Sequence, residues 1–135
     1  MEGLMVVIQP NGLYHAIPLS TAPSVGALQE AVEGYVEIVT RFETIRYSGE
    51  VMPCMVFCNE DGKLKGLAVN QLATTLWDQA LGHSIDDPMG RIPGDVLCGP
   101  VVVVLGDEEL IEEMWDALCR STRGPFTLPR LRQGA

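Results

Sequence analysis

The only two lysines of the chain, Lys63 and Lys65, have a spacing that indicates a binding site. Residues 63–67 are predicted to form a short strand, which puts both lysines on one face and Leu64 on the other. In a chain of net charge −9, this pair forms a local positive spot that attracts anionic ligands or acidic side chains of a partner. Asn59 and Glu60 in the preceding turn could add orienting hydrogen bonds. The sequence therefore predicts a ligand- or partner-binding site at Asn59, Glu60, Lys63 and Lys65.

A purely structural interpretation of the same segment stays open. Residues 59–62 have the composition of a tight turn, in which Gly62 is free to adopt a positive φ. Leu64 and Leu67 would be core residues, and Asn70 would cap the helix that follows. This interpretation gives no role to the two lysines on a shared face.

Two of the four cysteines, Cys54 and Cys58, have a C-x3-C spacing that zinc sites also use. The residues between them are typical of a strand, and four strand residues span about 13 Å, too far for two sulfurs on one zinc. We therefore expect no metal site and no cofactor. Cys54, Cys58, Cys98 and Cys119 are expected to be free, mostly buried thiols in a reducing compartment.

No catalytic residue is predicted. His15 and His83 are isolated, and neither a nucleophile-elbow pattern nor a phosphate-binding glycine loop occurs. Asp86 and Asp87 could be metal ligands, but beside Pro88 they are more simply turn residues. An enzyme whose site cannot be seen in the sequence remains an alternative.

The charge of the chain is unevenly distributed. Residues 1–119 hold five basic and 18 acidic residues, or −13, whereas residues 120–135 hold four arginines and no acid. Such a body repels nucleic acid and anionic lipid, so we expect neither groove binding of nucleic acid nor membrane binding. An acidic stripe on the outer side of the last predicted helix suits the helix dipole, but it could also imitate nucleic-acid phosphates and inhibit a nucleic-acid-binding protein. This stripe is formed by Glu109, Glu112, Glu113 and Asp116.

Apolar periodicity and turn residues predict about six strands and three helices. Strands are expected at residues 4–8, 13–17, 35–39, 52–58, 63–67 and 95–105, and residues 40–51 are expected to be a loop or a frayed strand extension. Helices are expected after the capping residues Ser24, Asn70 and Asp107. Residues 95–105 are so apolar that they predict a central strand.

These elements predict an α+β fold with a mainly antiparallel sheet and three helices packed on one face. We expect a single domain over residues 1–119, followed by an arginine- and proline-containing arm or tail over residues 120–135. This arm could lie against the acidic body or against a neighbouring subunit in a homo-oligomer. The longest apolar run, residues 101–105, is too short to span a membrane, and we expect a cytoplasmic protein.

Three segments of the chain together resemble a known family: residues 34–39, 58–70 and 94–103. It is an uncharacterised domain-of-unknown-function family of phages, prophages and plasmids, and the resemblance covers about residues 5–110. Its members show a CNEEGKLKGLPxN-type central motif. This chain departs from the family pattern at Ala68, where proline is usual, and in a longer connection at residues 40–52.

The resemblance implies an accessory protein of a mobile element and assigns no catalytic residue. We therefore expect a small non-enzymatic binding protein that modulates host machinery or counters a defence system. Its partner would be a small anionic ligand held near residues 59–65, or a host or defence protein docked on the acidic surface.

Overall fold

The computed structural model describes residues 2–81 and 95–121. The sequence expectations for His83, Asp86, Asp87 and the arm beyond Ser121 lie outside the described residues. The described elements are β1 (Gly3–Ile8), β2 (Tyr14–Leu19), α1 (Val25–Val32), β3 (Val36–Ile38), β4 (Thr44–Tyr47), β5 (Glu50–Asn59), α2 (Gln71–Ala80), β6 (Val101–Gly106) and α3 (Glu108–Ser121).

The six strands pair antiparallel throughout, in the order β2-β1-β6-β5-β3, and β4 pairs with the first half of β5. This confirms the α+β fold class and the central position predicted for the apolar run, since β6 lies between β1 and β5. Within that run only residues 101–105 are strand, as part of β6, whereas residues 95–100 are irregular apart from one bridge between Val69 and Cys98. No helix among the described residues is long and apolar enough to cross a membrane.

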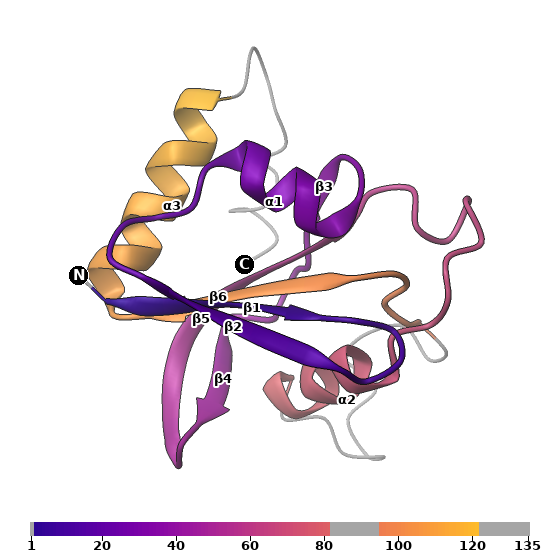
Figure 1. Cartoon of the computed structure of the whole chain (residues 1–135). Coiled ribbons are helices and arrows are strands. Elements are labelled where there is room, and N and C mark those ends of the chain that lie inside the picture. The colour runs from indigo at the N-terminus through magenta and orange to yellow at the C-terminus, as the bar shows by residue number, and fades with distance from the viewer. Residues whose placement is uncertain (1, 82–94, 122–135) are drawn as a thin grey trace.

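The helices cover both faces of the sheet, so the expectation that they share one face was wrong (Figure 1). On one face, α1 and α3 bury Leu28 and Met114 against Phe57 of β5. On the other face, α2 buries Trp77 against a second apolar layer that includes Val56. The physical reason is that β5 and β6 carry apolar side chains at nearly every position, so both faces of these central strands must be shielded from water.

Local signals for turns and caps are confirmed. Residues 9–12 close the β1–β2 hairpin, in which the amide of Gly12 donates to the carbonyl of Gln9. Ser24 accepts a hydrogen bond from the amide of Ala27, and Asn70 and Asp107 accept in the same way at the starts of α2 and α3. These bonds satisfy amide groups that have no partner within the first turn of a helix.

Two connections differ from the sequence expectations. Residues 44–47 lie in the segment that was expected to be a loop or a frayed strand extension, and they form β4, which turns back into β5 through Ser48 and Gly49 with φ of 50° and 83°. Residues 63–67, expected as a strand, lie within and just after a run of turns over residues 60–66. In this run Gly66, and not Gly62, has a positive φ, and Leu64 is 89% exposed instead of lying in the core.

Candidate functional site

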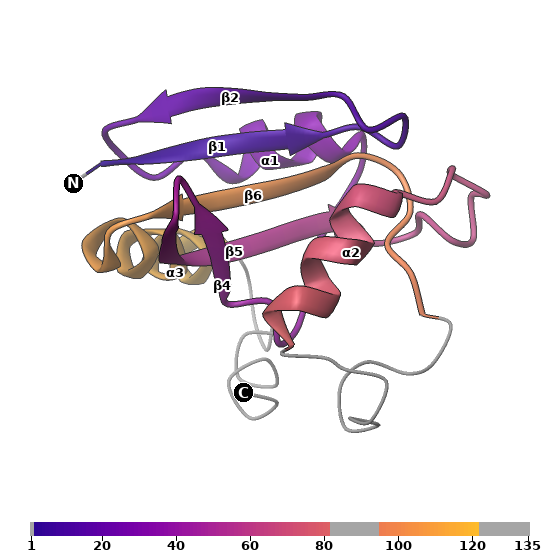
Figure 2. The ribbon, with the colours of Figure 1, turned by 90° about the horizontal axis from the view of Figure 1, so that it is seen from below.

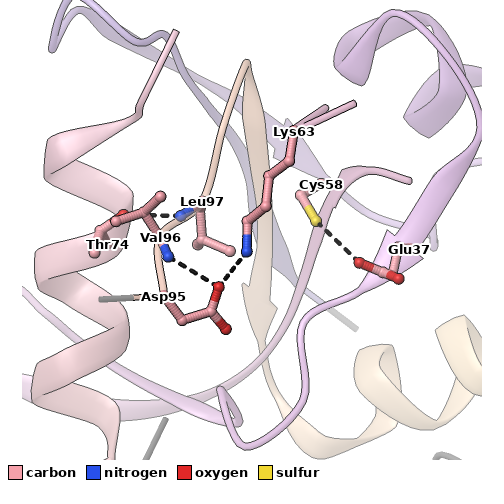
Figure 3. Close-up of polar contacts among 7 residues, drawn as sticks. All are labelled: Glu37, Cys58, Lys63, Thr74, Asp95, Val96 and Leu97. Atoms are coloured by element: carbon pink, nitrogen blue, oxygen red, sulfur yellow. Dashed lines mark hydrogen bonds and ion pairs between the residues drawn. The ribbon is translucent and has the colours of Figure 1, made fainter. Parts of the chain in front are cut away.

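A groove of about 770 Å³ opens beside the turns over residues 60–66. Its walls include β3, the end of β5, these turns and the segment 95–98 that leads into β6, and each of the three helices also contributes lining residues. The charged and thiol side chains that border it come from four separate parts of the chain (Figure 3). They are Glu37, Cys58, Glu60, Lys63, Asp95 and Cys98.

An ion pair joins the turns to the segment that enters β6. The Lys63 Nζ contacts Asp95 Oδ1, and this oxygen also accepts the amide of Val96 at 3.0 Å. The hydrogen bond to Asp95 is the main reason that the pKa of Lys63 is raised. Because the side chains of Lys63 and Asp95 are 59% and 25% exposed, the pair adds little to the free energy of unfolding. Its consequence is that the positive charge of Lys63 already has a partner within the protein.

A thiol and a carboxyl group meet on the opposite wall. The Cys58 thiol donates to Glu37 Oε1 at 3.8 Å, and Figure 3 shows these two side chains pointing toward each other. Burial, followed by the charge of Glu60, raises the pKa of Glu37. Burial, followed by the charge of Glu37, raises the pKa of Cys58 to about 12. The thiol is therefore protonated at neutral pH and is not an activated nucleophile.

Close main-chain contacts fix the turns against the segment 95–98. A Cβ atom at Gly62 would lie 3.0 Å from the carbonyl oxygen of Cys98, so a larger residue would push the two segments apart. The Thr74 hydroxyl of α2 accepts the amide of Leu97 at 3.0 Å. The Asn70 amide group donates to the carbonyls of Ile8 and Gly99, both at 2.9 Å. These contacts hold the segments that border the groove in fixed positions relative to each other.

The model of the family described as Domain of unknown function (DUF3846) matches residues 1–119. The chain belongs to the DUF3846 family. No curated protein and no solved structure matches the chain. All the groove residues named above lie within the matched DUF3846 region, as does most of helix α3.

The DUF3846 fold brings only some of the predicted site residues to the groove. Glu60 and Lys63 both border it. Lys65 is exposed but is not among the residues that border the groove, since the turns replace the strand that would have aligned the two lysines. Asn59 borders the groove but is 5% exposed, and its amide group donates to the carbonyls of Val32 and Glu33 at the end of α1.

The predicted acidic stripe lies on α3 of the DUF3846 domain. Glu109, Glu112 and Asp116 are exposed, as predicted for the outer side of the helix. Glu113 is half-buried, and its Oε1 accepts the amide of Ala22 at 3.3 Å, which ties α3 to the connection before α1. This glutamate therefore has a structural contact as well as a surface position.

Two residues of the DUF3846 groove were missed by sequence reasoning. Glu37 is the polar middle residue of the three-residue strand β3, and Asp95 was assigned to a strand. The sequence could have indicated Glu37, because successive side chains of a strand point to opposite faces. An acidic residue between two apolar ones therefore lies on the other face of the strand from them. Within residues 2–81 and 95–121, no group of three His, Cys, Asp or Glu side chains is close enough to hold a metal ion.

Proposed function

We propose that this chain is a small non-enzymatic binding protein of a phage or another mobile element, and that it acts in the host cytoplasm on a protein partner. By holding that partner it would modulate host machinery or counter a defence system. This setting is what the resemblance of residues 34–39, 58–70 and 94–103 to a family of phages, prophages and plasmids implies. The contact that we propose is a basic side chain of the partner that enters the groove.

The charge of the groove is the observation that carries this proposal. Among the described residues that border it, three are acidic (Glu37, Glu60 and Asp95) and one is a cation, Lys63. Asp95 is already engaged with Lys63, which leaves Glu37 and Glu60 as neighbouring acids. Burial is the larger cause of the raised pKa of Glu37, and the nearby negative charge of Glu60 is the second, as expected for two acids that repel each other. A guanidinium or ammonium group between them would relieve this repulsion.

Apolar surface beside the acids supports a protein partner over a small ion. Tyr35 and Leu64 border the groove and are 69% and 89% exposed. An exposed aromatic ring and an exposed leucine next to charged groups suit the aliphatic stem of a lysine or arginine and its apolar neighbours in a peptide. The small anionic ligand expected from the sequence is less well supported, because Lys63 is paired and Lys65 lies outside the groove lining.

The chemistry of the groove supports binding over catalysis. The thiol of Cys58 has its pKa raised to about 12, so it offers no thiolate at neutral pH. The Lys63 amine has its pKa raised as well, which keeps it protonated and unsuited to act as a nucleophile. At neutral pH the Cys58 thiol and the Lys63 amine are therefore both protonated, and each acts as a hydrogen-bond donor within the protein.

A peptide titration tests the proposal. Full-length protein is titrated calorimetrically with a short Leu-Arg-Leu peptide, with Leu-Glu-Leu as the matched anionic probe. We expect binding of the arginine peptide alone, and binding at least about tenfold weaker, or 1.4 kcal/mol, when Glu37→Gln and Glu60→Gln are combined. Glu50→Gln, an exposed acid outside the groove lining, is the control and should bind like the wild type. Equal binding of both peptides, or no effect of the double change, would overturn the proposal.

The proposed action against a host defence system needs a separate assay. The wild-type chain is expressed in a bacterial host with an active defence system, and the plating efficiency of a sensitive phage is measured. We expect the efficiency to rise with the wild type and with Glu50→Gln, but not with the combined Glu37→Gln and Glu60→Gln variant. If all three proteins act alike, the groove is not where the partner binds.

A further inference from the structure

Strand β2 is an edge strand with little cover on either face. Among the described strands it pairs with β1 alone, and Figure 2 shows it at the outer rim of the sheet, beyond the reach of α2. Residues 14–18 are all exposed, including Tyr14 at 66% and Ile17 at 40%. A strand edge of this kind offers unpaired main-chain amides and carbonyls to another strand.

The charge pattern of the chain indicates which strand this edge accepts. Residues 3–29 contain no Asp, Glu, Lys or Arg, although the whole chain has 27 such residues. Proteins commonly protect an edge strand with charged side chains or with proline. Strand β2 has no Asp, Glu, Lys or Arg, and Pro18 is its one protective residue of this kind. Two copies of a chain with net charge −9 can approach each other most easily where neither carries an acid.

The hydrogen-bond register shows which main-chain groups point outward. The Gln9 amide donates to the Leu13 carbonyl at 2.8 Å, so this pair is hydrogen-bonded across the hairpin. Because hydrogen-bonded and non-hydrogen-bonded pairs alternate in an antiparallel ladder, the main-chain groups of Tyr14, Ala16 and Pro18 point away from β1. The orientation at Pro18 agrees with this, since proline has no amide hydrogen to donate to β1.

We propose that β2 is a dimer interface, in which it pairs antiparallel with β2 of a second copy around a two-fold axis at Ala16. In this register each Ala16 amide donates to the Ala16 carbonyl of the other copy, and each Tyr14 amide donates to the Pro18 carbonyl of the other copy. Because Pro18 has no amide hydrogen, the Tyr14 carbonyl opposite it in the other copy receives no hydrogen bond across the interface. This carbonyl lies at the end of the strand, where it can bind water. The two six-stranded sheets thereby become one continuous sheet.

The side chains match this register on both faces. Tyr14, Ala16 and Pro18 lie on the face of Leu4 and Val6, which are only half-buried, so each Tyr14 would contact the Pro18 ring of the other copy. On the opposite face, His15 of one copy would lie opposite Ile17 of the other. No like charges meet across the axis.

Sedimentation equilibrium and native mass spectrometry of the full chain test the interface. We expect a mass of about twice 14.7 kDa for the wild type. Ala16→Glu and Ala16→Lys each place two like charges opposite each other at the axis, and each variant alone should be a monomer. An equimolar mixture of the two should form a heterodimer again, because unlike charges then meet. Circular dichroism should show that both variants are folded.

Three results would overturn the proposal. The first is a wild-type protein that stays monomeric at high protein concentration. This result would overturn the proposal even if β2 paired with a strand of another protein. The second is a dimer whose mass is unchanged by Ala16→Glu, which would mean that another surface forms it. The third is a mixture of the Glu and Lys variants that stays monomeric, which would rule out a two-fold axis at residue 16.

Discussion

The side chain of Asn59 at the end of β5 donates to the main-chain carbonyl of Val32 in the last turn of α1, at 3.0 Å. The same amide nitrogen also donates to the carbonyl of Glu33 at 3.2 Å. Glu33 has a left-handed backbone conformation, with a φ of 64°. A Cβ at Gly34 would come within 2.5 Å of this nitrogen, so a glycine is needed where the helix end and the asparagine meet. Asn59 therefore caps α1 from a strand 26 residues away.

Replacement of Asn59 should affect stability first. Asn59→Asp removes both donor bonds and puts a carboxylate against two carbonyls, so we expect the free energy of unfolding to fall by about 1–3 kcal/mol. Urea denaturation measures this change. Asn11→Ala removes an exposed side-chain bond to the amide of Leu13 and serves as the matched control, with an expected loss of under about 1 kcal/mol. Equal losses in the two variants would contradict the capping role.

Asn70 should be more sensitive than an ordinary helix cap. Its side chain accepts from the amide of Ala73 and donates to the carbonyls of Ile8 and Gly99, and it is fully buried. Asn70→Ala should therefore cost more than the roughly 1 kcal/mol of a lost cap. Asn70→Asp keeps the cap acceptor and loses both donor bonds, so it separates the two contributions. If Asn70→Asp unfolds at the same urea concentration as the wild type, the bonds to Ile8 and Gly99 contribute nothing.

The carboxyl group of Glu37 should make stability depend on pH in an unusual direction. Its pKa is raised in the folded protein, so between the unfolded value near 4.5 and the higher folded value the native state binds more protons than the unfolded chain. Stability from this group therefore falls as pH rises through that window. Glu37→Gln should gain melting temperature relative to the wild type as the pH is raised from about 4 to 7. Thermal melts at several pH values measure this difference, and a constant difference would contradict the raised pKa.

Lys63 and Lys65 should differ in their effects on the groove. Lys63→Gln removes a positive charge that borders it, so the Leu-Arg-Leu peptide should bind about threefold more tightly or better, as expected for one partly exposed charge. Lys65→Gln, outside the groove lining, should leave the affinity unchanged within error. Weaker binding of the arginine peptide by Lys63→Gln would contradict a cationic occupant. Stronger binding of Leu-Glu-Leu than of the arginine peptide by the wild type would favour the anionic ligand.

The thiols of Cys54 and Cys58 should react slowly with iodoacetamide. Burial raises the pKa of each to about 12, so at pH 8 about one molecule in ten thousand carries the thiolate. Leu64→Cys supplies a reference thiol at an exposed position, and we expect Cys54 and Cys58 to react at least about 100-fold more slowly than it does. Peptide mass spectrometry resolves the three sites. Comparable rates would mean that the strand opens readily.

The parts of the fold that the sequence predicted depend on contacts within a few residues. Ser24 and Asp107 each bond to an amide three residues later, so their capping role follows from local composition. The groove depends on pairs that are distant in the chain: Lys63 is 32 residues from Asp95, and Cys58 is 21 residues from Glu37. Alternation cannot reveal which segments meet across a sheet.

Residues 63–67 show why alternation also misled. Lys63, Leu64 and Lys65 alternate as a strand would, but none of the strands in the described part of the chain pairs with them. The amide of Lys65 instead donates to the Asp61 carbonyl, and that of Gly66 donates to the Lys63 carbonyl. With Gly66 at a φ of 70°, these local bonds turn the chain back before it enters α2. The exposed Leu64 is the result, and it is also the residue that gives the groove its apolar rim.

The position of β1 has a consequence for how the chain folds during synthesis. Residues 3–8 pair with residues 101–106, so β1 cannot complete its second ladder until nearly all of the matched region has left the ribosome. Of the strand ladders in the described residues, the β1–β2 hairpin and the ladders of β3 and β4 with β5 can form before that point, as two separate parts. Entry of β6 between them joins the parts in one late step. Pairing between segments so distant in the chain favours slow folding, and the apolar β6 is the segment that most needs protection from aggregation until it is paired.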